Sequence, residues 1–174
     1  MNRTRFSSYT LFGAALLAAT SALAAPFSQA SLPAEIHVPA GNKVAFETVG
    51  TGDITYECKQ TASGTEWVFA GPKAVLNNRA GEQVGIYYGP PATWEANDGS
   101  RLTATQVAVA PAGAGNLPYQ LVKANPVIGN GKLTGITFIQ RVALQGGVAP
   151  KMDCKVGENT KVAYKADYIF WKAN

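Results

Sequence analysis

Histidine, charge and nucleotide-binding motifs are all scarce in this sequence of 174 residues. One histidine, His37, supplies too few ligands for a zinc site once the two cysteines are bonded to each other. We therefore expect no metal and no cofactor. Charged side chains make up 15% of the chain, and the formal net charge is only +4. A strongly basic nucleic-acid-binding protein is therefore not indicated.

Motifs of nucleophilic or phosphate chemistry are missing too. The chain has no Gly-x-Ser-x-Gly turn, and a serine nucleophile would have to recruit His37. Gly113-Ala114-Gly115 lacks the third glycine of a dinucleotide fingerprint, and Gly131-Lys132 is followed by leucine instead of Ser or Thr. We therefore name no catalytic residue.

The first 24 residues have the pattern of a secretory signal peptide. Arg3 and Arg5 precede an apolar run, and Ala22 and Ala24 form the small-x-small pattern of a cleavage site. No later run approaches the roughly 18 apolar residues of a membrane-spanning helix. Cleavage would leave 150 residues with a net charge of +2, enough for one domain. We expect a secreted or periplasmic monomer, with residues 1–24 as the signal peptide, 25–40 as a lead-in segment and 41–174 as one β domain.

Both cysteines, Cys58 and Cys154, lie in the part that would be exported. An oxidising compartment and an even count favour one internal disulfide, which would close a loop of 95 residues. Chain entropy gives such a loop an upper limit of about 4–5 kcal/mol. Two free, buried thiols are the alternative.

Short runs rich in Val, Ile, Thr, Tyr and Phe recur about every ten residues, which is typical of an antiparallel sandwich or barrel. Ile54, Tyr56 and Cys58 alternate with more polar residues, so Cys58 should point into the core. We predict an all-β single domain, either an antiparallel β-sandwich or a flattened barrel of about eight strands. The runs expected to form strands are Lys43–Val49, Asp53–Lys59, Thr65–Ala70, Gln83–Tyr88, Arg101–Val109, Leu133–Leu144 and Lys161–Trp171.

Turn residues separate these runs. Asn97-Asp98-Gly99-Ser100 has the Asp-Gly preference of a two-residue hairpin, and Gly50-Thr51-Gly52 is expected to separate the first two strands. No ten-residue stretch has a clear apolar helical period. Val75–Asn78 or Pro118–Ala124 could each form one short helical turn.

The densest polar cluster, residues 94–101, contains an aromatic ring and both signs of charge. Glu95 and Asp98 could form a carboxylate pair of the kind that glycoside hydrolysis requires. They are three positions apart, and the turn starts between them, so a structural hairpin in which Arg101 pairs with Glu95 is the simpler interpretation. Tyr87 and Tyr88 are adjacent on a strand, so one ring should point outward. The candidate ligand-binding residues are Tyr87, Tyr88, Trp94, Glu95, Asp98 and Arg101.

One further residue is unusual. Arg141 lies within the apolar run 136–144. We expect it either on the solvent face or buried against a carboxylate such as Asp167, because unpaired burial of a charge is costly.

Several motifs, in order from about Leu32 to Phe170, resemble a secreted bacterial and fungal family, domain of unknown function 3455. The resemblance implies a secreted single domain and supports the two cysteines as one framework, but it brings no activity. Some members have a histidine before Gly89-Pro90, where this chain has tyrosines. The matching residues are Tyr56-Glu57-Cys58, Trp67-Val68-Phe69, Pro72, Ala74, Leu76, Gly89-Pro90, Trp94-Glu95, Asp98-Gly99-Ser100, Ile139-Gln140-Arg141-Val142, Gly146-Gly147-Val148-Ala149-Pro150, Cys154 and Tyr164-Lys165-Ala166-Asp167-Tyr168-Ile169-Phe170.

The sequence thus predicts an exported, non-enzymatic binding protein whose partner is a small molecule or cell-envelope glycan, with the aromatic and charged cluster as its surface. A carboxylate-based polysaccharide hydrolase is the first alternative. A structural or stress-protective envelope protein without a ligand is the second, and it predicts a domain without a cleft.

Overall fold

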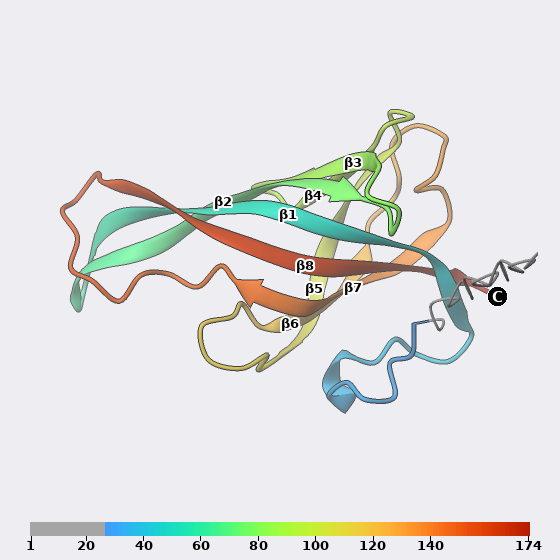
Figure 1. Ribbon diagram of the computed structural model, residues 1–174, viewed down its shortest axis with the longest axis horizontal. Helices are drawn as coiled ribbons and strands as arrows, with labels where there is room; N and C mark the ends of the chain where they lie inside the picture. Colours follow the sequence, from blue (N-terminus) through green and yellow to red (C-terminus); the bar gives the residue numbers. More distant parts are fainter. Residues whose placement is uncertain (1–26) are drawn as a thin grey trace, which may run out of the picture.

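The computed structural model describes residues 27–174, which form a closed antiparallel β-barrel (Figure 1). Each strand pairs with the next along the chain, and the last pairs with the first. The predicted all-β domain of about eight strands is confirmed, in its barrel form. The predicted signal peptide lies outside the described residues. The described elements are the 3-10 helix η1 (Ala34–Ile36) and the strands β1 (Asn42–Thr61), β2 (Gly64–Asn77), β3 (Gln83–Tyr88), β4 (Thr93–Ala96), β5 (Arg101–Ala110), β6 (Tyr119–Ala124), β7 (Ile136–Gly146) and β8 (Asn159–Ala173).

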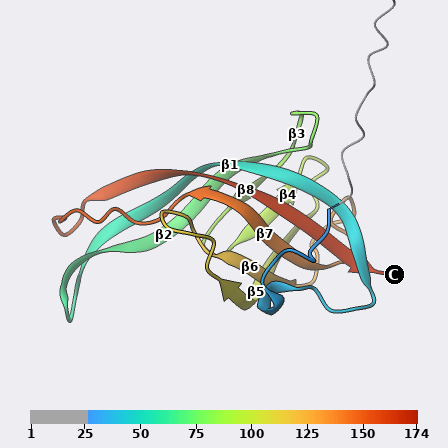
Figure 2. The ribbon, with the colours of Figure 1, turned by 60° about the horizontal axis from the view of Figure 1, so that its bottom comes forward.

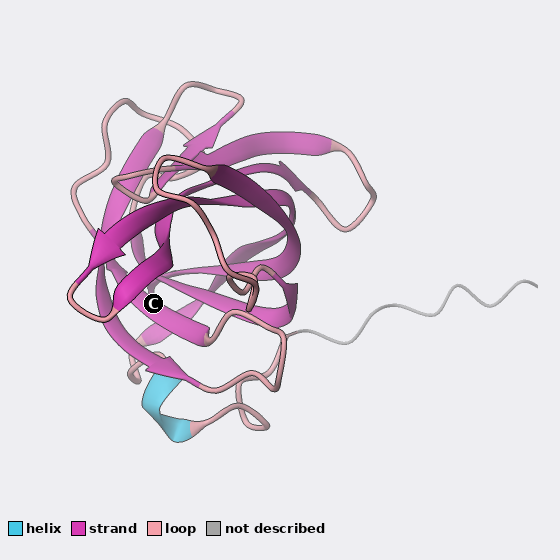
Figure 3. Cartoon of the chain, turned by 90° about the vertical axis from the view of Figure 1, so that its left-hand side faces the viewer, coloured by secondary structure: helices cyan, strands magenta, loops and turns pink. Residues whose placement is uncertain are grey.

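The interior of the barrel is filled by inward-pointing side chains, and the sheet surrounds this core when it is viewed along the barrel (Figure 3). Because successive side chains of a strand face opposite sides, every second residue of β8 contributes to the core. Ile54, Tyr56 and Cys58 of β1 are all buried, as their alternation predicted. Aromatic residues fill the middle of the barrel, namely Tyr87, Trp94, Tyr164, Tyr168 and Phe170.

A second, smaller core lies on the outside of the barrel, where residues 27–39 of the lead-in segment cover β5 to β8 (Figure 2). Ile36 of η1 is fully buried there. Gln140 of β7 donates a hydrogen bond of 2.6 Å from Nε2 to the carbonyl of Ile36, and accepts one of 2.9 Å from the indole of Trp171. The lead-in segment is therefore part of the folded domain. In residues 27–174 no helix is long and apolar enough to cross a membrane.

The turn predicted at Gly50-Thr51-Gly52 is wrong, because β1 continues through it as one strand of 20 residues. These glycines instead permit close contacts with neighbouring strands. A Cβ at Gly50 would lie 2.6 Å from the Tyr168 ring, and one at Gly52 would lie 2.1 Å from the carbonyl oxygen of Lys73. The absence of a side chain at these glycines therefore lets the Tyr168 ring and the β2 backbone pack closely against β1, and the glycines do not form a turn.

Both segments suggested as short helical turns are strands. Residues 75–77 belong to β2, and residues 119–124 form β6, whose Leu121 and Val122 are buried on opposite faces of the sheet. The four-residue strand β4 was not predicted, because it is too short to show a period of its own. The predicted strand at Leu133–Leu144 starts at Ile136, and the residues before it form a loop.

The two ends of the barrel differ. The disulfide end contains the β1–β2 hairpin and the loops before β4, β6 and β8; the hairpin and the β7–β8 loop extend to the left in Figure 1. The lid end contains the β4–β5 turn and the loop between β6 and β7. We call residues 129–135 of that loop the lid.

Candidate functional site

The candidate residues on the paired strands β3 and β4 lie on opposite faces of the barrel wall. Tyr87 lies opposite Trp94 in the register, and both side chains point inward. Tyr88 and Glu95, one position further along, point outward. The remaining two candidates belong to the β4–β5 turn and the start of β5. The six residues therefore do not form one surface.

The inner pair is part of the aromatic core. The rings of Tyr87 and Trp94 stack with centroids 4.7 Å apart, and Tyr168 packs against them at 5.1 and 5.9 Å. Burial raises the pKa of the Tyr87 hydroxyl. Only 1% of Trp94 is exposed. The expectation that Trp94 belongs to an exposed binding surface is therefore wrong, because the alternation of β4 turns its ring inward.

A small cavity of about 10 Å³ lies beside Trp94 at the lid end, lined also by Phe46, Thr48 and Leu133. That is about the space of one water molecule. Two buried polar atoms of its lining, the indole nitrogen of Trp94 and Oγ1 of Thr48, have no hydrogen-bond partner in the described part of the chain. The cavity thus has the size of a single water, and its lining is mostly apolar.

Asp98 has a structural role in the β4–β5 turn, which holds the lid. Its carboxylate accepts hydrogen bonds from the backbone and hydroxyl of Ser100, at 2.9 and 2.6 Å, and from the backbone of Lys132 at 2.7 Å. These bonds hold the pKa of Asp98 below its usual value, and the hydroxyl bond from Ser100 contributes most. The Ser100 hydroxyl in turn accepts a bond of 3.2 Å from the backbone N–H of Leu133. We call these contacts the clasp.

The outward pair lies in a groove of about 750 Å³ on the outer face of the sheet. The hydroxyl of Tyr88 donates a hydrogen bond of 2.9 Å to the carboxylate of Glu95. This bond is the main reason why the pKa of Tyr88 is raised. The groove lies across β1 to β4 and the start of β8, and its lining residues are Thr51, Gly52, Asp53, Lys73, Ala74, Val75, Ile86, Tyr88, Glu95 and Lys161.

The groove combines apolar and charged side chains. Val75 and Ile86, which lie opposite each other on β2 and β3, are each 38% exposed. Two acidic side chains, Asp53 and Glu95, and two basic ones, Lys73 and Lys161, line it. Such a surface, with apolar area and separated polar groups of both signs, suits a ligand that has apolar patches and hydrogen-bonding groups.

Arg101 lies next to this groove, on the outer face. It is exposed and is the register partner of Glu95 across the β4–β5 hairpin. No ion pair joins the two side chains, although both lie in the described part of the chain. The predicted hairpin is confirmed, with Gly99 at a positive φ of 84°, but the predicted pairing of Arg101 with Glu95 is wrong.

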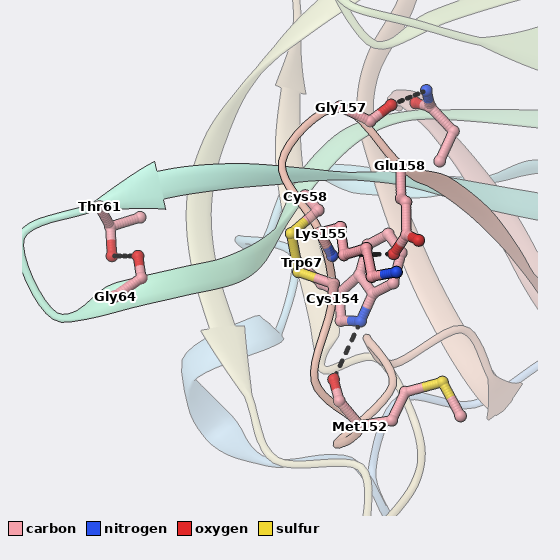
Figure 4. Close-up of a disulfide and its surroundings, with 10 residues drawn as sticks. Cys58, Thr61, Gly64, Trp67, Met152, Cys154, Lys155, Gly157 and Glu158 are labelled. Carbon is pink, nitrogen blue, oxygen red and sulfur yellow. Dashed lines mark hydrogen bonds between the residues drawn. A yellow bond between two sulfur atoms is a disulfide. The ribbon is translucent and has the colours of Figure 1, made fainter.

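The disulfide end carries the predicted bond between Cys58 and Cys154 (Figure 4). Cys58 is buried on β1, and Trp67 is its register partner on β2. The indole of Trp67 donates a hydrogen bond of 3.2 Å to the carbonyl of Met152. The disulfide and this bond attach the β7–β8 loop to the long hairpin. The alternative of two free thiols is excluded.

Comparison with known proteins places the chain in a family. A family profile described as "Protein of unknown function (DUF3455)" matches residues 39–172, which is most of the barrel. The chain belongs to the DUF3455 family. Neither the curated proteins nor the solved structures contain a match to it. The relationship therefore supports the domain but assigns no activity.

Several lining residues of the groove in this DUF3455 domain were not predicted. Asp53, Lys73 and Lys161 come from three strands, and no motif links them in the sequence. The alternation along each strand predicts that these side chains point outward. Whether they lie close together depends on which strands are neighbours in the sheet. That information depends on the pairing of β1 with both β2 and β8.

The carboxylate pair of the hydrolase alternative, Glu95 and Asp98, does not share a site in this domain. Glu95 lines the groove, whereas the Asp98 carboxylate is engaged in the clasp at the lid end. His37 is also engaged, because its Nε2 is 3.0 Å from the carbonyl of Leu32. Within residues 27–174 no group of three or more His, Cys, Asp or Glu side chains is placed to hold a metal ion.

Proposed function

We propose that this DUF3455 protein is an exported, non-enzymatic binding protein whose outer groove takes up a hydroxyl-rich ligand such as a cell-envelope glycan. The observation that carries the proposal is the groove of about 750 Å³ with its Tyr88–Glu95 hydrogen bond. Export is supported by the disulfide, because such bonds persist in oxidising compartments.

The chemistry of the groove supports a carbohydrate. A sugar ring has apolar C–H faces that can lie on Val75, Ile86 or the ring of Tyr88, and hydroxyl groups that donate to carboxylates and accept from ammonium groups. Tyr88 is well suited, because tyrosine combines an apolar ring with a polar hydroxyl at mixed surfaces. The bond from its hydroxyl holds the Glu95 carboxylate in place before a ligand arrives, which lowers the cost of binding.

The alternatives make different predictions for the groove. A ligand-free structural protein has no use for a groove with exposed apolar residues and charges of both signs. A hydrolase needs two carboxylates across an open cleft, and Asp53 and Glu95 both line the groove. Conversion of a bound glycan into shorter products would therefore replace our proposal with the hydrolase.

The test is binding of a panel of envelope and plant-type oligosaccharides to the oxidised exported chain, measured by calorimetry. For a ligand found in this way, Glu95→Gln should weaken binding by roughly 10- to 100-fold, because it removes a charged acceptor. The matched control is Glu66→Gln, which changes the same charge on the exposed β1–β2 hairpin away from the groove and should bind normally.

Failure can take two forms. If no member of the panel binds, a glycan function is rejected. If a glycan binds and Glu95→Gln and Glu66→Gln behave alike, then the ligand binds outside the groove and the site is wrongly assigned.

A further inference from the structure

Arg141 points into the barrel, against both alternatives expected for it. It lies opposite Tyr168 of β8 in the register, on the same face as Ile139 of the interior core. Asp167, the expected partner, lies opposite Val142 on the outer face, where the guanidinium of Arg79 is 2.8 Å from its carboxylate. A cation inside a barrel needs an explanation, because unpaired burial of charge is costly.

The guanidinium of Arg141 has few partners. Its Nη2 donates one hydrogen bond, of 3.0 Å, to the carbonyl of Pro118. Its Nε is buried and has no hydrogen-bond partner among residues 27–174. The ion pairs and cation–π contacts of the same residues include none to Arg141. Since a guanidinium carries five N–H donors, the bond to Pro118 does not account for this side chain.

The groups near Arg141 are neutral hydroxyls. Burial raises the pKa of four tyrosines of the interior, and the positive charge of Arg141 acts on each of them in the opposite direction. These four are Tyr56, Tyr87, Tyr164 and Tyr168. Tyr168 is the register partner of Arg141, and its hydroxyl is 3.1 Å from that of Tyr164. None of these neighbours carries a negative charge that would compensate the guanidinium while the tyrosines stay protonated.

Amide side chains lie next to Arg141 on the same face. Arg141 itself is half-buried, and Gln120 of β6, its other register partner, is half-buried too. The side-chain amide of Gln120 donates a hydrogen bond of 2.8 Å to the exposed Gln106 of β5. Arg141 is therefore not fully enclosed, and its neighbours on β6 and β5 are neutral amides that also form hydrogen bonds.

We propose that Arg141 is the centre of an oxyanion-binding site on the inner face of the barrel, for a carboxylate, sulfate or phosphate group. Neighbouring N–H groups of a guanidinium can bind two oxygens of such a group at once. An oxyanion would compensate the charge and complete its hydrogen bonds. This site is separate from the outer groove, so it stands or falls independently of the glycan proposal.

The test observes the arginine directly. From residue 25 on, the chain has three arginines, Arg79, Arg101 and Arg141, and their Nε–Hε groups give separate NMR signals after ¹⁵N labelling. We expect sodium phosphate, titrated against sodium chloride at equal ionic strength, to shift the Arg141 signal with saturation. The signals of the other two should move only slightly. Parallel titrations with acetate and galacturonate show whether a free phosphate or a carboxylate-bearing ligand binds more tightly.

Variants supply the second readout. Arg141→Met keeps the size of the side chain and removes its charge, and phosphate binding should weaken by roughly 10- to 100-fold. Arg141→Lys keeps the charge but loses the fork and should bind with intermediate affinity. Lys123→Met, an exposed change of the same charge on β6, should bind as the unmodified chain does.

The proposal is overturned if the Arg141 signal does not saturate or moves in parallel with those of Arg79 and Arg101. It is also overturned if Arg141→Met binds phosphate with unchanged affinity. Should that variant fail to fold, the titration of the unmodified chain decides alone.

Discussion

The two ends of the barrel are closed by different kinds of bond. At the disulfide end, a covalent link joins the long β1–β2 hairpin to the β7–β8 loop. At the lid end, the turn holding Asp98 and Ser100 binds residues 132 and 133 only through hydrogen bonds and the burial of Leu133.

The surroundings explain this difference. Around the disulfide, large apolar side chains remain exposed: Phe69 is 53% exposed and Met152 is 70% exposed. These two side chains leave much of their apolar area in water, so their burial contributes little to holding the hairpin and the loop together. At the lid end, Leu133 is 2% exposed and packs into the interior core. The covalent bond thus lies beside exposed apolar side chains, whereas the lid is held by a buried one.

The largest effect is expected at the covalent end. Replacing both cysteines, as Cys58→Ser with Cys154→Ser, should lower the free energy of unfolding by about 2–5 kcal/mol. The reason is the separation of 96 residues between the linked positions, which constrains the unfolded chain. Denaturant unfolding measures the loss, and the unmodified chain after reduction should behave like the variant. A loss below about 1 kcal/mol would mean that the hairpin is held by its packing.

A smaller effect is expected at the clasp. Ser100→Ala removes a buried hydroxyl and leaves the N–H of Leu133 without its acceptor. The cost should be about 1–3 kcal/mol, measured in the same way. Ser63→Ala at the exposed tip of the β1–β2 hairpin is the control and should change stability by less than about 0.5 kcal/mol. Equal values for both would show that the clasp does not hold the lid.

The clasp should also respond to acid, whereas the disulfide should not. Because the pKa of Asp98 is lowered in the fold, its contribution is fully present above the ordinary value of 3.8 and is lost as the pH falls through the folded pKa. We expect Asp98→Asn to be less stable than the unmodified chain at neutral pH, and this difference to shrink below pH 3.8. Thermal unfolding against pH measures it, and a difference independent of pH would contradict the assignment.

The smallest effect on stability is expected on the barrel wall between the ends. Tyr88→Phe removes only a half-buried hydrogen bond to Glu95 on the outer face, so the free energy of unfolding should change by less than about 1 kcal/mol. Ligand binding in the groove should nevertheless weaken. A large loss of stability would mean that the Tyr88–Glu95 bond belongs to the structural framework.

Much of this architecture follows from alternation along the strands. The inward direction of Cys58, the opposite directions of Tyr87 and Tyr88 and the hairpin at Asp98-Gly99 can all be read from local pattern. The same pattern puts Trp94 inside, once β4 is recognised as a strand. A strand of four residues is too short to show an alternating pattern in the sequence, and the Trp94 ring was therefore expected on the surface.

Long-range contacts could not be read in the same way. Gly50 and Gly52 have the composition of a turn, but the Tyr168 ring and the β2 backbone decide their role. The run of residues around Arg141 predicts it on the solvent face or beside a carboxylate such as Asp167, but the register of β7 against β8 turns it inward and places Asp167 on the opposite face. The groove likewise depends on which strands are neighbours. The set of residues that line the groove therefore depends on how the strands pair in the closed barrel, and the pattern of a single strand does not predict it.

The pairing of β1 with β8 has a consequence for how the protein is made. All other strand pairs join neighbours in sequence, so their hairpins can form as the chain is synthesised. Closure requires Asn42 to meet Ala173, and residues of β8 fill the aromatic interior. Until β8 has been synthesised, the barrel cannot close, and the apolar side chains that face its interior stay without the strand that covers them. A chaperone that shields these side chains would be needed only for that interval.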